Sequence, residues 1–545
     1  MNDAIVTTLS PSGHTDGFAR ANLPPQPTWP QFLFDLPELH YPERLNCVAE
    51  LLDDAIGRGW GGRTALIGAR ERLTYAELQA RVDRVAHVLR DDLGLVTGNR
   101  VLVRGANCPT MAACILGVIK AGCIAVPTMP LLRARELGAI VDKAQVNAVL
   151  CAGALVGEVD ALGLTVPVLV FDDPAPNSPD MLEQRMARYG EPFAAADTAA
   201  DDVCLISFTS GTTGIPKGTM HFQRDVLAIC DCFPRHILRS QANDVFIGTP
   251  PLAFTFGLGG LLLFPLRVGA CGVLIEKLTP ETLLGAIAEH RATVCFTAPT
   301  FYRQMAAQAA RFDLSALRAS VSAGEALPVA TREVWQAATG LAMIDGIGAT
   351  ELLHIFISSA GDDIRPGATG KPVPGYQACI VDGLGRRMGP GVIGRLAVKG
   401  PTGCRYLADD RQRDYVQNGW NLTGDAYEMD EDGYFYYRSR MDDMIISSGY
   451  NIAGAEVEEA LLHHPAVAEC GVVGRSDPVR GQVVEAHIVL RAGHVGTADL
   501  AHQLQEFVKA QIAPYKYPRA ILFKEQLPRT ETGKLQRFKL RTEAV

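Results

Sequence analysis

The chain has 545 residues, enough for about three to five folding units at the usual domain size. Hydrophobic residues make up 48% and charged residues 20%, which excludes a disordered, collagen-like or coiled-coil protein. The chain has 51 Lys and Arg against 60 Asp and Glu, which gives a net charge of −9. It therefore lacks the overall basic charge that would indicate a nucleic-acid partner.

The 13 cysteines occur singly, without a CxxC pair or a Cys/His cluster. Neither a disulfide framework nor a zinc site is therefore indicated. Scattered thiols are typical of a reducing compartment, and the first 25 residues lack the apolar core of a secretory signal. We expect a cytoplasmic protein.

Residues 1–45 are Pro-rich and are expected to form either a docked arm or a loose tail. From residue 46 helix-like and strand-like segments alternate, which indicates parallel strands covered by helices on both faces. Helices are predicted over 73–95, 108–121, 131–146 and 281–290, and strands over 100–105, 123–128, 148–153, 166–171, 270–276, 292–297 and 318–323.

One uncharged stretch, residues 245–266, fits either a membrane span or a buried strand, a loop and the start of a buried helix. Pro250, Pro251 and four glycines break a spanning helix, and Pro265 is expected to add another stop. We predict the buried alternative and no membrane contact.

From about residue 370 short Gly-rich strands indicate a small antiparallel sheet or barrel-like part. After Asp442 a compact α+β segment follows, with helices over 453–463 and 497–511 and strands over 467–474, 484–490 and 519–524. The predicted fold class is α/β. Its parts are an N-terminal arm (1–45), a large domain (46–440) with a β-rich subdomain (370–440), and a small C-terminal α+β domain (441–545).

The most informative segment is SFTSGTTGIPKGTMH, residues 207–221, which follows a predicted strand. Ligands bind at such strand ends in open α/β sheets, and glycines let backbone N–H groups approach an anion. Gly211 leads to Pro216-Lys217-Gly218, so this is not a Walker loop. Against the alternative of an ordinary surface turn, we predict a phosphate loop made of Thr209, Ser210, Gly211, Thr212, Thr213, Gly214 and Lys217.

TSGTTGIPKG resembles the signature of the adenylate-forming superfamily, which includes acyl- and aryl-CoA ligases, peptide-synthetase adenylation domains and firefly luciferase. Further segments match in the family's order: SAGEAL (322–327), DGIGATE (345–351), LTGD (422–425) and PRTETGKLQR (528–537). The resemblance covers roughly residues 45–540. It implies that a carboxylate attacks the α-phosphorus of ATP, giving an acyl-adenylate and pyrophosphate, and that the thiol of coenzyme A then displaces AMP.

The resemblance implies catalytic roles for Lys534, Glu351 and Thr350. Lys534 would bridge the acid and the α-phosphate, and Glu351 would hold Mg²⁺, which needs only one or two protein carboxylates. Asp425 would accept the ribose hydroxyls, and Arg440 would contact the ribose or a phosphate. The other implied nucleotide contacts are Ala323, Gly324, Glu325, Asp345, Gly346 and Tyr437. Each role has a structural alternative. Lys534 could be a solvated surface lysine and Glu351 a glutamate at a helix N-terminus. Asp425 could be an ordinary turn aspartate and Arg440 part of a surface ion pair.

In the family the C-terminal domain turns between the two half-reactions, about a residue that Asp442 matches. Ser439 stands where the family usually has Gly, so a slightly different hinge is expected. The thiol-binding candidates are Ser448, Gly449, Tyr450 and Arg475. Residues 515–541 carry a net charge of +6, which fits either a patch for ATP and CoA phosphates or a solvated face.

The acyl pocket is expected between residues 245–266 and the 346–354 loop. Aromatic walls and glycines suit a planar ring better than a long flexible chain. The candidates are Thr255, Phe256, Gly257, Gly346, Ile347, Gly348 and His354, of which His354 fits a core histidine as well. GIGATELLHIF resembles the benzoate-CoA ligases, and GCRYL (403–407), GWNLTGDAY (419–427) and DDMIISSGYNIAGAEVE (442–458) resemble the 2-aminobenzoate-CoA ligases.

We therefore expect an AMP-forming aryl-CoA ligase that uses ATP, Mg²⁺ and coenzyme A, with 2-aminobenzoate as its acid, as a monomer or homodimer. The alternatives are a benzoate- or other substituted-benzoate-CoA ligase, a medium-chain acyl-CoA ligase, and a free-standing enzyme that loads a carrier protein. A non-catalytic nucleotide-binding protein is disfavoured because Lys217 and Lys534 are both present.

Overall fold

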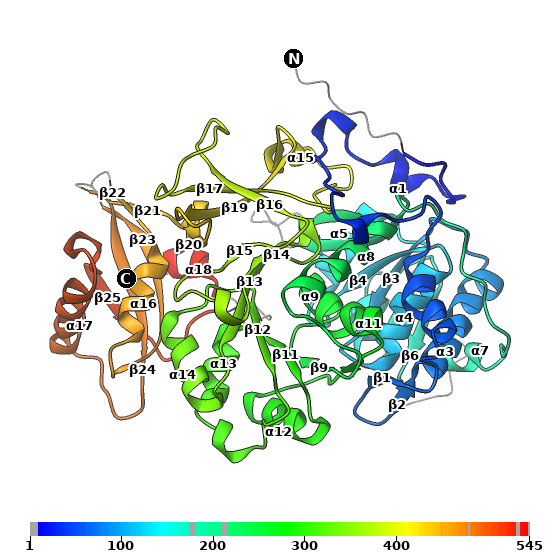
Figure 1. Cartoon of the computed structure of the whole chain (residues 1–545), viewed down its shortest axis with the longest axis horizontal. Coiled ribbons are helices and arrows are strands. Elements are labelled where there is room, and N and C mark those ends of the chain that lie inside the picture. The colour runs from blue at the N-terminus through cyan, green and yellow to red at the C-terminus, as the bar shows by residue number, and fades with distance from the viewer. Residues whose placement is uncertain are drawn as a thin grey trace.

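The computed structural model describes residues 9–173, 181–209, 216–447, 450–477, 480–529 and 535–542. Figure 1 shows two α/β sheets with their helices in the centre and at the right, and a smaller C-terminal sheet at the left. The α/β fold class predicted from the sequence is confirmed by this arrangement.

The first sheet has six strands in the order β6-β5-β3-β4-β7-β8. All neighbouring strands are parallel except β7 and β8, which form an antiparallel hairpin. Every residue of β3 and β4 is buried, as expected for parallel strands with helices on both faces. The strands are β3 (Arg100–Arg104), β4 (Ile124–Thr128), β5 (Ala148–Ala152), β6 (Val168–Phe171), β7 (Val203–Thr209) and β8 (Lys217–Phe222).

Of the helices around this sheet, the first three named below begin within a few residues of their predicted starts, and the last two have no predicted counterpart. They are α3 (Tyr75–His87), α4 (Pro109–Lys120), α5 (Ala134–Ala144), α6 (Val156–Asp160) and α7 (Leu182–Met186). The side chain of Thr74 accepts a hydrogen bond from the backbone N–H of Glu77, and the Glu77 carboxylate accepts one from the backbone N–H of Thr74, so α3 begins with a capping box.

The second sheet has nine strands in the order β15-β14-β13-β12-β11-β9-β10-β1-β2. Its middle, from β1 to β13, is parallel, and β2, β14 and β15 are antiparallel at the edges. The strands of this second sheet are β1 (Thr64–Ile67), β2 (Arg72–Thr74), β9 (Val245–Gly248), β10 (Cys271–Val273), β11 (Val294–Thr297), β12 (Ala319–Ala323), β13 (Met343–Gly348), β14 (Ile355–Ser358) and β15 (Lys371–Pro372). Further helices of the large domain are α2 (Asp54–Gly57), α8 (Gln223–Asp231), α9 (Phe233–His236), α12 (Pro280–His290), α13 (Pro299–Ala306) and α14 (Val329–Thr339).

The uncharged stretch of residues 245–266 is buried, as predicted. It forms β9, a loop, and then a helical run made of α10 (Thr255–Gly257), the π-helical segment η6 (Leu258–Leu263) and α11 (Phe264–Val268). The expected stop at Pro265 is wrong, because Pro265 lies in the first turn of α11, where a missing N–H costs little after the wider π-type turns. Within the part of the chain that the structure describes, no helix combines the length and apolar character that crossing a bilayer requires.

The β-rich segment forms an antiparallel sheet of β16 (Gln377–Val381), β17 (Gly394–Lys399), β18 (Val416–Gln417), β19 (Trp420–Met429) and β20 (Phe435–Arg440), with helix α15 (Gln412–Tyr415) beside it. The chain then builds a separate sheet of β21 (Ile445–Ser447), β22 (Tyr450–Ile452), β23 (Val467–Asp477), β24 (Gly481–Leu490) and β25 (Ala520–Phe523). With it lie α16 (Gly454–Leu462), α17 (Ala498–Gln511) and α18 (Arg537–Thr542), and the interior residues of this region form a hydrophobic cluster of their own. The domain boundary at residue 440 remains our proposal.

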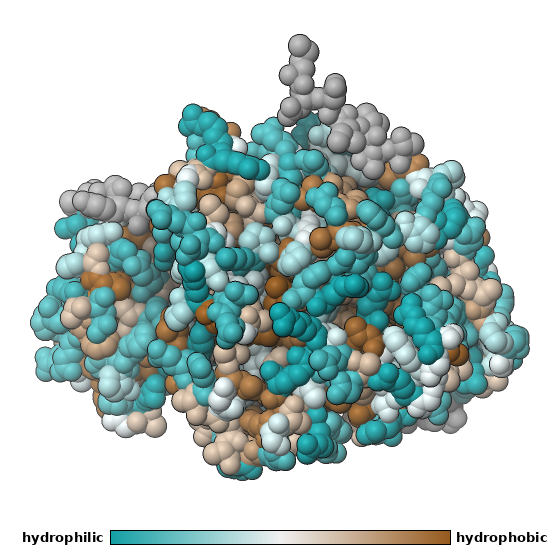
Figure 2. All heavy atoms as spheres, viewed as in Figure 1, coloured by the Kyte–Doolittle hydropathy of each residue, from teal (hydrophilic) through white to brown (hydrophobic). Residues whose placement is uncertain are grey.

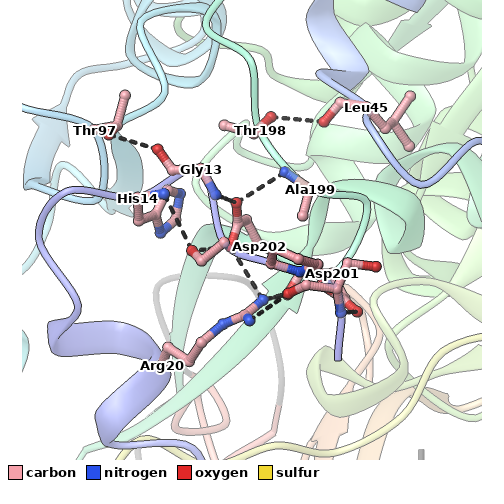
Figure 3. Close-up of polar contacts among 12 residues, drawn as sticks. Gly13, His14, Arg20, Leu45, Thr97, Thr198, Ala199, Asp201 and Asp202 are labelled. Carbon is pink, nitrogen blue, oxygen red and sulfur yellow. Dashed lines mark hydrogen bonds and ion pairs between the residues drawn. The ribbon is translucent and has the colours of Figure 1, made fainter. Parts of the chain in front are cut away.

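The N-terminal segment from residue 9 is docked on the large domain rather than loose. Figure 3 shows it, with the short helix α1 (Phe18–Ala21), against Asp201 and Asp202. The backbone N–H of Gly13 donates to Asp202 (2.8 Å), and the Arg20 guanidinium pairs with Asp201 (3.0 Å). Further along, the ring of Phe32 contacts the guanidinium of Arg405. The arm therefore reaches from the six-stranded sheet to the β-rich segment.

The surface shown in Figure 2 is mainly polar, with hydrophobic residues scattered over it. Leu384, Val495 and Phe538 are exposed but belong to different parts of the chain. Scattered exposed hydrophobic residues are ordinary in folded proteins.

Candidate functional site

The predicted phosphate loop connects the two strands of the β7–β8 hairpin. Thr209 and Lys217 are paired residues at the mouth of this hairpin, and both are half-buried. Ser210, Gly211, Thr212, Thr213 and Gly214 lie outside the described residues. The hairpin thus fixes both ends of the loop at the edge of the six-stranded sheet.

Tyr406, which is absent from the predicted site residues, contacts both Glu351 and Lys217. Glu351 lies with Thr350 on η8 (Thr350–Leu352), a single 3₁₀ turn that packs against β7. The hydroxyl of Tyr406 donates to the Glu351 carboxylate (2.5 Å), and the ammonium of Lys217 lies 5.3 Å from the centre of the Tyr406 ring. The sequence signal that contains Tyr406 is the segment GCRYL (403–407), which resembles the 2-aminobenzoate-CoA ligases.

The segments SAGEAL and DGIGATE lie side by side at the carboxyl ends of neighbouring parallel strands. Ala323 at the end of β12 pairs in register with Gly346 on β13, and Ser322 pairs with Asp345. Gly324 follows with a φ of +89°, a conformation that favours glycine. The Glu325 carboxylate accepts a hydrogen bond from the Thr300 hydroxyl (2.8 Å). This edge is where ligands bind in open α/β sheets.

Asp345 is a buried carboxylate in this edge. Its Oδ1 atom has no hydrogen-bond partner among the residues that the structure describes. Burial raises the pKa of Asp345 to about 7, against a weaker opposing influence of Arg332. Folding therefore favours the protonated acid at this position.

We expect Asp345→Asn to change how stability depends on pH. Between about pH 4 and 7 the folded state binds more protons at Asp345 than the unfolded state, since its pKa is raised from 3.8 to about 7. The stabilisation from this group is therefore greatest at low pH and is lost as the pH rises through that window. Because Asn does not ionise, the Tm of the variant minus that of the wild type should rise by several degrees between pH 5 and 8. A difference that is flat with pH in scanning fluorimetry would contradict the raised pKa.

Asp425 and Arg440 are paired residues on β19 and β20 and form an ion pair (2.9 Å). Asp425 is buried, whereas 47% of the Arg440 side chain is exposed. Tyr437 on the same strand is half-buried, and its ring lies 5.5 Å from that of Tyr427. The pair would present one carboxylate and one cation to a nucleotide, although an ion pair alone is also what a structural role predicts.

A small hollow separates this strand pair from the C-terminal domain. It is lined by Tyr437, Ser439 and Arg440 on one side and by Gly454, Val472 and Arg537 on the other. Asp442 lies on the short turn η10 (Met441–Asp443) that connects the two parts; its side chain is outside the described part. The hinge role of Asp442 remains our proposal.

Lys534, Ser448 and Gly449 lie outside the described residues, as does the side chain of Tyr450. Arg529 and Leu535, which flank the lysine loop, form an isolated β-bridge. Arg529 contacts Glu325 of SAGEAL (3.4 Å) and also pairs with Glu469 (2.9 Å). Arg529, which precedes the lysine loop, therefore lies beside the SAGEAL segment.

A second contact holds the two domains in this orientation. The carboxylate of Glu459 on α16 accepts hydrogen bonds from the backbone N–H groups of Val329 (2.9 Å) and Ala330 (3.2 Å), which begin α14. Such a carboxylate is favourable at a helix N-terminus. Arg475, the remaining thiol-binding candidate, pairs with Glu485 on the neighbouring strand β24 (3.0 Å).

Of the predicted acyl-pocket residues, Phe256 and Gly348 lie next to His354. The rings of Phe264, Phe256 and Phe233 lie 4.5, 5.7 and 5.8 Å from the imidazole. A Cβ at Gly259 would lie 2.4 Å from His354, and a Cβ at Gly257 would lie 2.2 Å from the carbonyl oxygen of Pro251. The helical run that begins at α10 can therefore pack directly against His354 and Pro251 because it has glycine at these two positions. Thr255, Gly257 and Gly346 are buried, Phe256 and Ile347 are half-buried, and Gly348 is exposed.

His354 is 2% exposed and lies in an apolar environment. Burial lowers its pKa to about 3, so the imidazole is neutral at physiological pH. The Nε2 atom lies 3.4 Å from the carbonyl oxygen of Phe256. Since a carbonyl only accepts, this contact favours the tautomer in which Nε2 carries the proton. Nδ1 is then an acceptor, and it has no partner among the residues that the structure describes.

Glu351 suits the magnesium ion that the sequence resemblance implies. Across the described ranges no group of three or more His, Cys, Asp or Glu side chains could hold a metal ion by itself. Mg²⁺ keeps several waters and takes one or two carboxylates together with substrate phosphates. A single buried glutamate beside the phosphate-loop hairpin fits this pattern.

Comparison with known proteins shows the family to which the chain belongs. The family model described as AMP-binding enzyme matches residues 54–406, and that of the AMP-binding enzyme C-terminal domain matches residues 456–534. The benzoate-CoA ligase of Thauera aromatica is 38% identical over 517 residues, which cover 93% of this chain and 97% of that protein.

Two solved structures extend the similarity to the fold. The crystal structure of the anthranilate CoA ligase AuaEII with anthranoyl-AMP gives a TM-score of 0.87 at 32% identity, and covers 93% of this chain and 98% of its own. A benzoate CoA ligase from Burkholderia xenovorans LB400 gives 0.83 at 33% identity, with 91% and 100% covered.

The chain therefore belongs to the AMP-binding, adenylate-forming enzymes. Within them it is an acid–thiol ligase of the AMP-forming type.

Proposed function

We propose that this chain is an aryl-CoA ligase whose preferred acid is 2-aminobenzoate. A carboxylate is a poor electrophile because its carbonyl is electron-rich, so the enzyme first converts it to an aryl-adenylate with loss of pyrophosphate. The thiol of coenzyme A then displaces AMP. The similarity to proteins named benzoate- and anthranilate-CoA ligases supports an aromatic acid, since anthranilate is 2-aminobenzoate.

The observation that carries the proposal is the aromatic cluster around His354. Phe256, Phe264 and Phe233 surround the imidazole, and the helical glycines keep the surrounding backbone close. Such a compact apolar region suits a flat ring, which stacks against or meets other rings edge-on. A long flexible chain would need a deeper channel.

His354 offers a hydrogen-bond acceptor that would favour an acid with an ortho-amino group. Its Nδ1 atom has no hydrogen-bond partner among the described residues. An unpaired acceptor in an apolar site costs free energy, and a ligand donor that reaches it removes that cost. In this proposal the ortho-amino group of the acid donates to Nδ1.

The nucleotide half of the site uses residues of both domains. The phosphate-loop hairpin with Lys217 would hold the phosphates, Asp425 the ribose, and Lys534 the bridging position between acid and α-phosphate. Glu351 would hold Mg²⁺, which when bound neutralises charge on the phosphates. The tasks of the protein are then positioning and charge stabilisation. A cytoplasmic monomer or homodimer without nucleic-acid or membrane partners completes the proposal.

We expect kcat/KM to fall in the order 2-aminobenzoate, benzoate, hexanoate. The step from 2-aminobenzoate to benzoate should be about 10-fold, because one buried hydrogen bond is lost. The variant His354→Leu should lower kcat/KM for 2-aminobenzoate by a similar factor and change that for benzoate much less. The measurement is acyl-CoA formation followed by HPLC across this panel, with 2-hydroxybenzoate as a further donor-bearing acid.

The same panel separates the alternatives. The highest kcat/KM for hexanoate would indicate a medium-chain ligase. The highest kcat/KM for benzoate would contradict the proposed hydrogen bond between the amino group and His354 Nδ1. Adenylate without any thioester in the presence of coenzyme A would indicate an enzyme that loads a carrier protein.

A further inference from the structure

The segment that carries Tyr406 extends the edge of the six-stranded sheet. The backbone N–H of Met220 donates to the carbonyl of Arg405 (2.8 Å), and the N–H of Leu407 donates to the carbonyl of Gly218 (2.8 Å). Thr219 and Tyr406 form a β-bridge between these bonds. Residues 405–407 therefore run beside β8 directly after Lys217, so the position of Tyr406 is fixed relative to the phosphate-loop hairpin.

The Tyr406 side chain joins two charged groups of the adenylation site. It is fully buried, and its hydroxyl donates to Oε1 of Glu351 (2.5 Å). Burial and the Glu351 charge raise the pKa of Tyr406, so the phenol keeps the proton that it donates. The Lys217 ammonium lies 5.3 Å from the centre of its ring, within the range of a cation–π contact.

We propose that Tyr406 is a positioning residue, which orients the Glu351 carboxylate for the metal-bound nucleotide. A glutamate on a single 3₁₀ turn has a long side chain with several rotamers, and ordering it costs conformational entropy. A hydrogen bond to Oε1 fixes the carboxylate before the nucleotide arrives and leaves Oε2 available. This follows the rule that ligating carboxylates are themselves hydrogen-bonded.

The backbone of Tyr406 is held independently of its hydroxyl. Its N–H donates to the side-chain oxygen of Gln412 (2.9 Å), and Gln412 also donates to the carbonyl of Cys404 (3.0 Å). With the β8 contacts, these bonds keep residues 404–407 in place when only the hydroxyl is removed. Tyr406→Phe therefore isolates the contact with Glu351 and keeps the ring beneath Lys217.

The inference rests on the nucleotide half of the proposed function and is independent of which acid the enzyme uses. The test is therefore the binding of ATP to the full chain without any acid, measured by calorimetry with and without Mg²⁺. In Tyr406→Phe the Kd of ATP with Mg²⁺ should rise about 10-fold, because a hydrogen bond to a charged group is lost. The Kd of ATP without the metal should stay within about two-fold of the wild type.

A matched control is Tyr75→Phe. The Tyr75 hydroxyl is also buried and donates to the carbonyl of Ala270 (2.8 Å), far along the chain from the residues of the site. Its loss should lower Tm and leave both ATP dissociation constants unchanged. A purely structural role of Tyr406 would give the same result as this control, and that outcome would overturn the proposal.

Glu351→Gln completes a double-mutant cycle that stays informative when the single Tyr406 variant folds poorly. If the Tyr406 hydroxyl acts through the Glu351 carboxylate, removing it should matter little once that carboxylate is gone. The Kd of ATP with Mg²⁺ should then differ by less than about two-fold between the double variant and Glu351→Gln alone. Effects that multiply would contradict the proposal. Wild-type protein that fails to bind ATP with Mg²⁺ at all would instead count against the proposed function.

Discussion

Replacing Lys534 by alanine is expected to slow formation of the acyl-adenylate by about 10²–10³-fold. The lysine would stabilise negative charge that builds between the acid and the α-phosphate, a contribution made mainly in the transition state. The flanking Arg529 contacts Glu325 beside the nucleotide edge. ATP–pyrophosphate exchange with 2-aminobenzoate measures this half-reaction directly.

Two comparisons make the Lys534 result specific. Lys539→Ala removes an exposed lysine from the same domain and should leave the exchange rate unchanged. The second half-reaction, measured from preformed aryl-adenylate and coenzyme A, should be affected much less by Lys534→Ala, because Lys534 is proposed to leave the site before it. Wild-type exchange in Lys534→Ala would show that the mechanism is wrong.

Replacing Arg405 by methionine should destabilise the protein by about 3–5 kcal/mol, because it leaves the Asp225 carboxylate buried without its counter-charge. Both side chains are fully buried, and the Arg405 guanidinium pairs with Asp225 and stacks 3.8 Å from the centre of the Phe222 ring. Burial lowers the pKa of Arg405 and raises that of Asp225, so each charge depends on the other for its stabilisation. Thermal and urea unfolding measure the loss.

The double variant Arg405→Met with Asp225→Leu should regain most of this stability, because no unpaired charge then remains. The exposed pair Arg386–Asp382 is the matched control, and Arg386→Met should cost less than about 1 kcal/mol. A single Arg405→Met variant with wild-type Tm would show that the pair is not needed for folding.

Much of the fold could be predicted because it depends on local patterns. The alternation of apolar runs and amphipathic segments predicted α4, β3, β4 and β5 within a few residues, since strand burial and helical periodicity are properties of short windows. The same holds for β7, the strand that leads into the phosphate loop. The stop expected at Pro265 does not occur, because the π-type turns of η6 admit the proline and have no comparable local signal in the sequence.

The sequence by itself determined the class of chemistry: a glycine- and hydroxyl-rich loop with Lys217, the carboxylates Glu351 and Asp425, and the fold that holds them. The tertiary structure decided which distant side chains meet. Tyr406 reaches Glu351 across 55 positions, and Arg405 reaches Asp225 across 180. Both contacts arise because residues 405–407 add to the edge of β8, and such pairing between remote segments follows from the packing of the whole chain, which no local pattern encodes.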